Sequence, residues 1–163
     1  MVIRRALIVD AMLGSLARKL RIYGFDTVYD KDSEDSSMLV AAKTESRTLV
    51  TCDKELHKLA VQRNLQSILL NKGLEVEKMV EVISGLDLKP LRICPEESRC
   101  PLCNGDLIGV SNLIAPSSIP QSIRQRHQRF YICRLCGKSY WEGSHWEKIS
   151  SFSADVEERL SLQ

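Results

Sequence analysis

Four of the six cysteines form two Cys-x-x-Cys pairs, and this pattern constrains the fold of the chain most. The pairs are Cys100-Pro-Leu-Cys103 and Cys133-Arg-Leu-Cys136, and a glycine closely follows each. Two thiolates three residues apart can grip one ion in a tight turn, so two such pairs predict a closed tetrahedral site of the kind that zinc favours. Because such a site has no open position, we expect a structural zinc that folds a segment too small for its own core.

The rest of the sequence argues against disulfides. The N-terminus lacks the apolar segment and cleavage site of a secretory signal, and no apolar run approaches the roughly 18 residues that span a bilayer. We therefore expect an intracellular, cytoplasmic protein with no membrane segment, in which metal binding is the default for paired cysteines. An iron–sulfur cluster and four ordinary buried cysteines are the alternatives that the spacing leaves open.

The first half of the chain alternates short apolar runs with helix-like patterns. The runs span residues 6–9, 27–29, 48–51 and 67–70, and Ser36 or Ser37 can cap the second helix. Strand–helix alternation with short loops predicts an α/β domain with a parallel sheet and flanking helices over residues 1–93. Residues 91–93 are either a last strand or a linker.

The second half differs in composition. It contains both cysteine pairs and four of the five prolines, and helical stripes become rare. Residues 111–123 are typical of a loop or an extended insertion. We therefore expect a small four-cysteine zinc ribbon over residues 94–150 and a C-terminal tail over residues 151–163.

Acidic side chains follow the expected strands at their carboxyl ends. Asp10 follows the first strand and Asp53 the third, and the loop after the second strand contains four more acids, Asp30, Asp32, Glu34 and Asp35. In a parallel sheet these ends share one edge, where open α/β sheets bind ligands. Converging carboxylates repel one another unless a hard cation such as Mg²⁺ or Mn²⁺ lies between them, and such ions activate water for attack on a phosphodiester. Asp10, Asp35 and Asp53 could each instead be a helix N-cap, and spacing alone leaves the two roles near even.

A basic segment lies between residues 124 and 138, which contain five Arg or Lys residues and no acid. The net charge is only +2, so this local arrangement is more informative than the mean. Together with Tyr131, Tyr140 and Trp141, the segment predicts a face that contacts RNA phosphates and stacks on bases, although a merely solvated loop is the alternative. The residues expected to contact RNA are Arg18, Arg21, Arg124, Arg126, Arg129, Lys138, Trp141 and His145.

Three segments carry a resemblance to a known family. They are Val9-Asp10-Ala-Met-Leu-Gly14-Ser-Leu-Ala-Arg18 with its continuation to residue 27, Leu49-Val-Thr51-Cys-Asp53-Lys-Glu55-Leu56, and the ribbon ending from Cys133 to Trp146. In this order, over residues 5–150, they resemble the PIN-like RNase family named for the C-terminal domain of the mutator-seven exonuclease. The resemblance implies a PIN-like domain fused to a zinc ribbon, and metal-dependent cleavage of RNA.

Carried over by position, the resemblance implies that Asp10, Asp35 and Asp53 hold a catalytic Mg²⁺ or Mn²⁺, with Glu55 in an accessory place. The sequence departs from the family at Cys52, where the family often has Arg. The acids crowded before Asp35 leave Asp30 or Asp32 as its possible replacement.

Three functions compete at this point. The first, which we favour, is a Mg²⁺- or Mn²⁺-dependent ribonuclease that cuts within RNA, with a zinc ribbon that helps to bind the substrate and room for a protein or ribonucleoprotein partner. The second is a non-catalytic RNA-binding adaptor in which the acids are caps only. The third is a receiver-like phosphoacceptor at Asp53, which requires a fifth strand ending in Lys.

Overall fold

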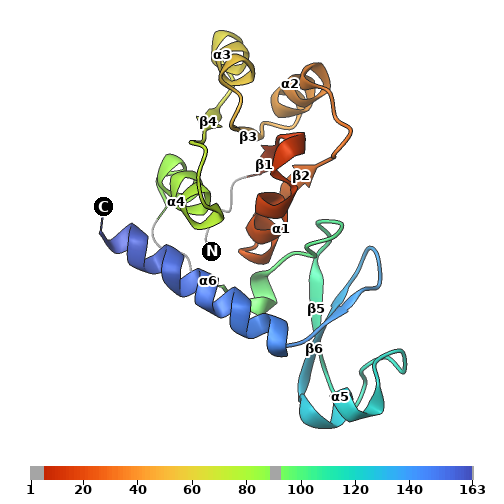
Figure 1. Cartoon of the computed structure of the whole chain (residues 1–163). Helices are drawn as coiled ribbons and strands as arrows, with labels where there is room; N and C mark the ends of the chain where they lie inside the picture. The colour runs from red at the N-terminus through yellow and green to blue at the C-terminus, as the bar shows by residue number, and fades with distance from the viewer. Residues whose placement is uncertain (1–5, 89–92, 163) are drawn as a thin grey trace.

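The computed structural model describes residues 6–88 and 93–162. It contains a four-stranded parallel sheet with helices on both faces and a three-stranded antiparallel sheet, and a long C-terminal helix returns from the second sheet to the first unit (Figure 1). The expected α/β architecture with flanking helices is therefore confirmed. No helix in the described ranges is both long and apolar enough to cross a membrane.

The parallel sheet consists of the four strands expected from the sequence, with the order β2-β1-β3-β4. Their bounds are β1 Leu7–Val9, β2 Thr27–Tyr29, β3 Thr48–Thr51 and β4 Ser67–Leu69. The chain passes from β1 to β2 on one side and then returns past β1 to β3 on the other. The direction of winding therefore reverses between the neighbouring strands β1 and β3.

Helices cover both faces because the central strands are apolar on both sides. In β1, Leu7 and Val9 pack with the helices α1 and α4, whereas Ile8 packs with α2 and α3. Successive side chains of a strand point to opposite faces, so a run of three apolar residues serves two cores. The helices are α1 Gly14–Ile22, preceded by the 3₁₀ turn η1 Ala11–Leu13, then α2 Asp35–Thr44, α3 Lys54–Gln62 and α4 Glu75–Gly85.

The start of α2 differs from the prediction. The helix begins at Asp35, so Ser36 and Ser37 lie inside its first turn and none of these three residues is the N-cap. Glu34 takes that position without a capping hydrogen bond from its side chain. Several polar residues stand in a row here, and the helix begins before the serines that were expected to cap it.

The second sheet has the antiparallel order β5-β6-β7. Its elements are η2 Pro95–Glu97, β5 Leu107–Ser111, α5 Gln121–Arg126, β6 Arg129–Cys133 and β7 Ser139–Tyr140. We call residues 95–143 the ribbon. Of the segment expected as a loop, 111–123, residues 112–120 join β5 to α5, whereas residue 111 ends β5 and residues 121–123 begin α5. A small cluster of Ala115, Ile119 and Phe130 holds the connection in place. Residues 91 and 92, in the expected last strand or linker, lie outside the described residues, and no fifth strand of the described chain joins the parallel sheet.

The C-terminal segment is a helix and not a tail. Helix α6, Ser144–Ser161, packs against α4, and Val156 is fully buried among core residues of α1 and α4. Phe152 and Leu160 pack against the same cluster. These apolar residues are spaced four apart, which is the period of a helix that buries one face. Helix α6 thus crosses the expected boundary between the ribbon and the tail at residues 150 and 151, and it continues to Ser161.

Candidate metal centre and acid edge

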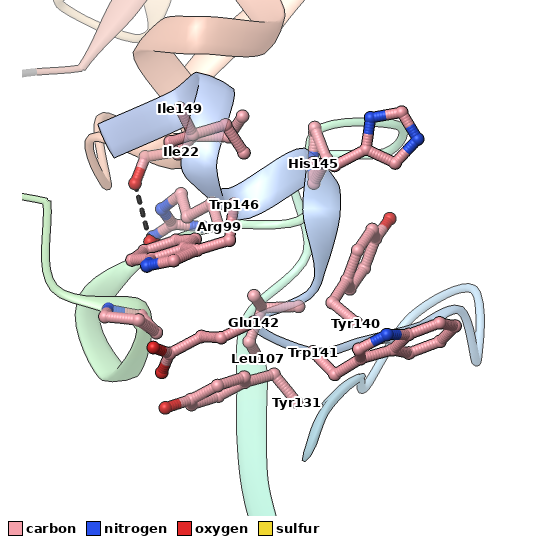
Figure 2. A pocket seen from close by; sticks show the side chains of 13 residues that line it. Ile22, Arg99, Leu107, Tyr131, Tyr140, Trp141, Glu142, His145, Trp146 and Ile149 are labelled. Atoms are coloured by element: carbon pink, nitrogen blue, oxygen red, sulfur yellow. Dashed lines mark hydrogen bonds between the residues drawn. The ribbon is translucent and has the colours of Figure 1, made fainter. Parts of the chain in front are cut away.

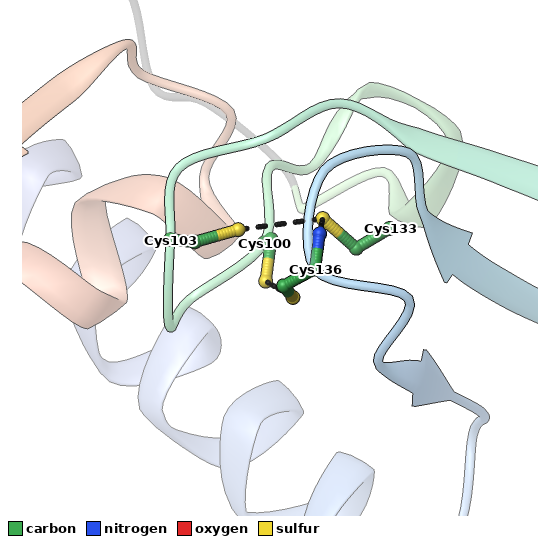
Figure 3. A group of neighbouring side chains, drawn as sticks. All are labelled: Cys100, Cys103, Cys133 and Cys136. Carbon is green, nitrogen blue, oxygen red and sulfur yellow. Dashed lines mark hydrogen bonds between the residues drawn. The ribbon is translucent and has the colours of Figure 1, made fainter.

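The four paired cysteines meet at one point of the ribbon (Figure 3). Their sulfur atoms all lie within 4.8 Å of one another. The Sγ atoms of Cys100 and Cys136 are 3.7 Å apart, and those of Cys103 and Cys133 are 3.4 Å apart. A zinc ion with Zn–S bonds of about 2.3 Å gives tetrahedral edges of about 3.8 Å. The group can therefore hold a metal such as zinc.

The backbone around the cysteines fits thiolate ligands. The N–H groups of Leu135 and Cys136 point at the sulfur of Cys133, at 3.4 and 3.5 Å. A Cβ atom at Gly105 would lie 2.8 Å from the same sulfur, so glycine allows the close approach. Burial alone would raise the pKa of Cys100, but hydrogen bonds from the Tyr140 hydroxyl and from backbone N–H groups outweigh burial and lower it to about 7. The pKa of Cys103 shifts the other way, to about 12, because of burial and then of hydrogen bonds with the other thiols, so a bound cation is needed for all four cysteines to be thiolates.

Arg21 attaches the first cysteine pair to the α/β unit. Its side chain is buried and donates to the carbonyl oxygens of Thr27 at 3.0 Å, Pro101 at 3.0 Å and Leu102 at 3.1 Å. Burial lowers the pKa of Arg21, and the nearby thiols oppose that shift. This placement contradicts the expectation that Arg21 contacts RNA, because the guanidinium faces carbonyl groups of the protein itself.

Asn104 makes a second attachment beside the first. It donates to Asp26 Oδ1 at 2.7 Å and accepts from the backbone N–H of Thr27 at 3.0 Å. Asp26 also forms an ion pair with Arg47, at 3.0 Å. Burial alone would raise the pKa of Asp26, but the hydrogen bonds from Arg47 and Asn104 hold it below its usual value. Because Thr27 is the first residue of β2, these contacts fix the ribbon at the amino-terminal edge of the sheet.

Asp10 and Asp53 lie at the opposite edge, where the winding of the sheet reverses. Asp10 directly follows β1, and Asp53 follows β3 after Cys52. The hydroxyl of the buried Thr51 joins them, since it donates to Asp10 Oδ2 at 2.6 Å and accepts from the backbone N–H of Asp53 at 2.9 Å. Open α/β sheets bind ligands at this kind of reversal. We call these three residues the acid edge.

Both acids of this edge also cap helices, as the sequence allowed. Asp10 accepts from the backbone N–H of Met12, at 3.3 Å. Asp53 Oδ1 accepts from the N–H groups of Glu55 and Leu56, at 2.7 and 3.1 Å. Within the described residues, no hydrogen bond to the second oxygen of Asp53 is found, and this side chain is exposed. Capping therefore leaves one carboxylate oxygen of Asp53 open to a ligand.

The other acids lie along the same edge but do not form a ready metal cluster with Asp10 and Asp53. Asp35 and Glu55 are exposed in the first turns of α2 and α3, and Asp30 accepts from the backbone N–H of Asp32 at 3.0 Å. Throughout residues 6–88 and 93–162, the four cysteines are the one group of three or more His, Cys, Asp or Glu side chains that lie close enough to share an ion. Metal binding by Asp35, Glu55, Asp30 or Asp32 stays a prediction.

The basic segment has fewer free cations than its sequence suggests. Arg129 pairs with Glu96, an acid from η2 that lies outside the segment in sequence, and Arg124 donates to the carbonyl of Ile119 at 3.1 Å. Trp141 packs against Phe130, with ring centroids 6.2 Å apart. The remaining predicted contacts are exposed, namely Arg18, Arg126, Lys138 and His145, together with Arg134.

Comparison with known protein families bears on both units. The family model of the Mut7-C RNAse domain matches residues 5–153, which include the parallel sheet, the acid edge and the cysteine cluster. The chain belongs to this family. Membership in the Mut7-C RNAse domain family indicates a nuclease-like function that acts on RNA. A comparison with curated proteins found no match.

The structure of this Mut7-C RNAse domain includes connecting residues that the sequence did not single out. Thr51 connects the two acids, and its signal in the sequence is the Thr-x-Asp spacing at a strand end. Asn104 and Asp26 hold the ribbon in place, and no local pattern indicated that they meet.

Proposed function

We propose that this Mut7-C RNAse domain is a Mg²⁺- or Mn²⁺-dependent ribonuclease that cuts phosphodiester bonds within RNA at the acid edge. The observation that carries the proposal is the pairing of Asp10 and Asp53 through Thr51, at the reversal of the sheet. Mg²⁺ in proteins that act on phosphates is commonly bound by one or two carboxylates plus water and the substrate, so these two acids are a sufficient protein contribution.

The side chains of the acid edge have separate tasks in this proposal. Thr51 orients the Asp10 carboxylate by its hydrogen bond to Oδ2, and the α3 N-terminus fixes Asp53 through Oδ1. Asp10 and the free oxygen of Asp53 would hold the cation. When bound, the cation supplies a lowered pKa for an attacking water and charge stabilisation on the phosphate. Asp35 and Glu55, which are exposed on the same edge, are proposed to bind as accessory groups once RNA is present.

The ribbon contributes the second part of the proposed function. Zinc held by the four cysteines would keep the ribbon folded, since its own apolar cluster is small. The exposed cations Arg126, Arg134 and Lys138 would contact phosphates, so that affinity for RNA falls as salt rises.

The test of the nuclease is Asp53→Asn. The amide keeps the capping oxygen but loses the charge that retains a cation, so we expect cleavage to fall at least about 100-fold while RNA binding and folding persist. Cleavage of labelled RNA with Mg²⁺ or Mn²⁺ gives the measurement, and Asp155→Asn on the exposed face of α6 is the matched control. Wild-type cleavage by purified Asp53→Asn protein would remove the acid edge from consideration.

One observation favours a second function, the RNA-binding adaptor. Asp10 and Asp53 both already serve as caps, so their presence at strand ends is accounted for without a metal. In that case wild-type protein binds RNA in a salt-dependent manner but cleaves none with either metal, and Asp53→Asn changes neither property.

A further inference from the structure

A pocket of about 130 Å³ lies between the ribbon, the end of α1 and the start of α6 (Figure 2). Four aromatic side chains line it, Tyr131, Tyr140, Trp141 and Trp146. Sites for drug-sized ligands have volumes of about 300–1,000 Å³, so this pocket suits a single planar ring system.

The aromatic walls are held in place from outside the pocket. The Tyr131 hydroxyl donates to Glu96 at 3.1 Å, and the Tyr140 hydroxyl lies 3.1 Å from the sulfur of Cys100. Trp141 packs on Phe130. The two tyrosine contacts use the hydroxyl groups and not the ring faces, and a site fixed in this way loses little freedom on binding.

Glu142 is the one carboxylate that lines the pocket, and the cation among the lining residues, Arg99, is already paired with Asp106. Figure 2 shows the Glu142 carboxylate between the rings of Trp146 and Tyr131, and no hydrogen bond or ion pair of this carboxylate is found within the described residues. Among the residues that line the pocket, Glu142 is therefore the one anion that faces a ligand.

We propose that this pocket binds an unpaired base of RNA, and guanine in preference to the other bases. Unpaired bases are commonly recognised by stacking on aromatic side chains and by hydrogen bonds to their Watson–Crick edge. A carboxylate only accepts hydrogen bonds, so it selects edges that donate. Guanine presents two adjacent donors on that edge, its ring N1–H and its amino group, whereas each other base presents one donor beside an acceptor. The inference rests on the proposed function insofar as RNA is the ligand.

This pocket is separate from the acid edge. Ile22, the last residue of α1, lines the pocket, whereas Gly14, the first, adjoins the turn that follows Asp10. The two sites thus lie at opposite ends of one helix. The pocket would anchor the substrate and take no part in bond cleavage.

The two tryptophans of the chain both line the pocket, so tryptophan fluorescence reports its occupancy directly. We expect GMP to quench the zinc-loaded, full-length protein saturably, at lower concentration than AMP, CMP or UMP. Stacking is worth about 1–3 kcal/mol per base, so Trp146→Ala should weaken binding about 5- to 150-fold, and Trp146→Phe should retain most of it.

The preference for guanine is tested at Glu142. The Glu142→Gln protein should bind GMP, AMP and UMP about equally. The control is Glu147→Gln, at an exposed neighbouring residue outside the pocket, which should keep the guanine preference.

Three results would overturn the proposal. They are the absence of saturable quenching by any nucleotide, a guanine preference that survives Glu142→Gln, and stronger quenching by a trimethyllysine peptide, which would assign the aromatic walls to a cation. The titration needs neither Mg²⁺ nor cleavage, and Asp53→Asn protein should give the wild-type curve. An inactive enzyme that binds GMP would therefore refute the nuclease alone, and an active enzyme without quenching would refute the pocket alone.

Discussion

Single side chains connect the two units of this protein, and they do so over long sequence distances. Arg21 reaches the carbonyl groups of Pro101 and Leu102, and Asp26 meets Asn104. The sequence placed Asp10 and Asp53 correctly at strand ends, because a strand end and a helix cap are local features. It misassigned Arg21, since two of the three carbonyl groups that accept from this residue come from a segment about 80 positions later, which no local pattern indicates.

Asp26 gives a prediction at this scale. Its pKa is depressed in the folded protein by Arg47 and Asn104, below the unfolded value of about 3.9. A depressed carboxyl pKa contributes stability that is complete above the unfolded value and is lost as pH falls through the folded one. Between pH 5 and pH 3, the wild-type protein should therefore lose more free energy of unfolding than Asp26→Asn, as measured by urea denaturation.

The matched control for Asp26 is Asp87→Asn. Asp87 is exposed after α4 with a backbone φ of 54°, a conformation that asparagine tolerates. This variant should lose as much stability as the wild type over the same interval. Equal losses in wild-type and Asp26→Asn protein would show that the contacts of Asp26 add no pH-dependent stability.

At the scale of elements, local pattern predicted the parallel sheet well. All four strands lie within one residue of the expected bounds, because each is a short apolar run followed by apolar residues at helical spacing. Helix α6 was missed, although Ile149, Phe152, Val156 and Leu160 have helical spacing. The core that Val156 enters is made by α1 and α4, and no feature near residue 156 identifies that partner.

Removal of zinc tests which elements depend on the metal for their folded structure. After chelation, amide groups of β5, β6 and α5 should lose protection from hydrogen exchange, because the ribbon has only a small apolar cluster of its own. Helices α1 to α4 and the second half of α6 should stay protected, since Val156 packs in the α/β core. Hydrogen exchange with mass spectrometry reads both regions in one sample, and metal analysis should give about one zinc per chain beforehand.

Restored protection on adding zinc is the control for damage by the chelator. Loss of protection throughout α6 at the same rate as in β6 would contradict the prediction. In that case the C-terminal helix would depend on the ribbon and not on the α/β core.

At the scale of the molecule, the acid edge and the ribbon lie at opposite ends of α1. The acid edge lies at the carboxyl ends of the strands, and the ribbon is attached at their amino ends through Arg21 and Asn104. Helix α1 has nine residues, which corresponds to about 13 Å along its axis. The sequence predicted both units but not their placement at opposite edges of the sheet. That placement is determined by contacts between distant segments, which no local pattern indicates.

The separation predicts where RNA is cut. If a guanine enters the aromatic pocket while a phosphate reaches the acid edge, the intervening strand must span at least about 13 Å, or about four nucleotides stacked at 3.4 Å each. An otherwise uridine-rich RNA with one guanosine should then be cut at a fixed offset from it. Moving the guanosine by two positions should move the cut by two, as mapped on sequencing gels. Glu142→Gln should scatter the cuts without abolishing them, whereas Asp53→Asn should abolish them. Cuts by the wild type that ignore the guanosine would show that the pocket does not position the strand that the acid edge cleaves.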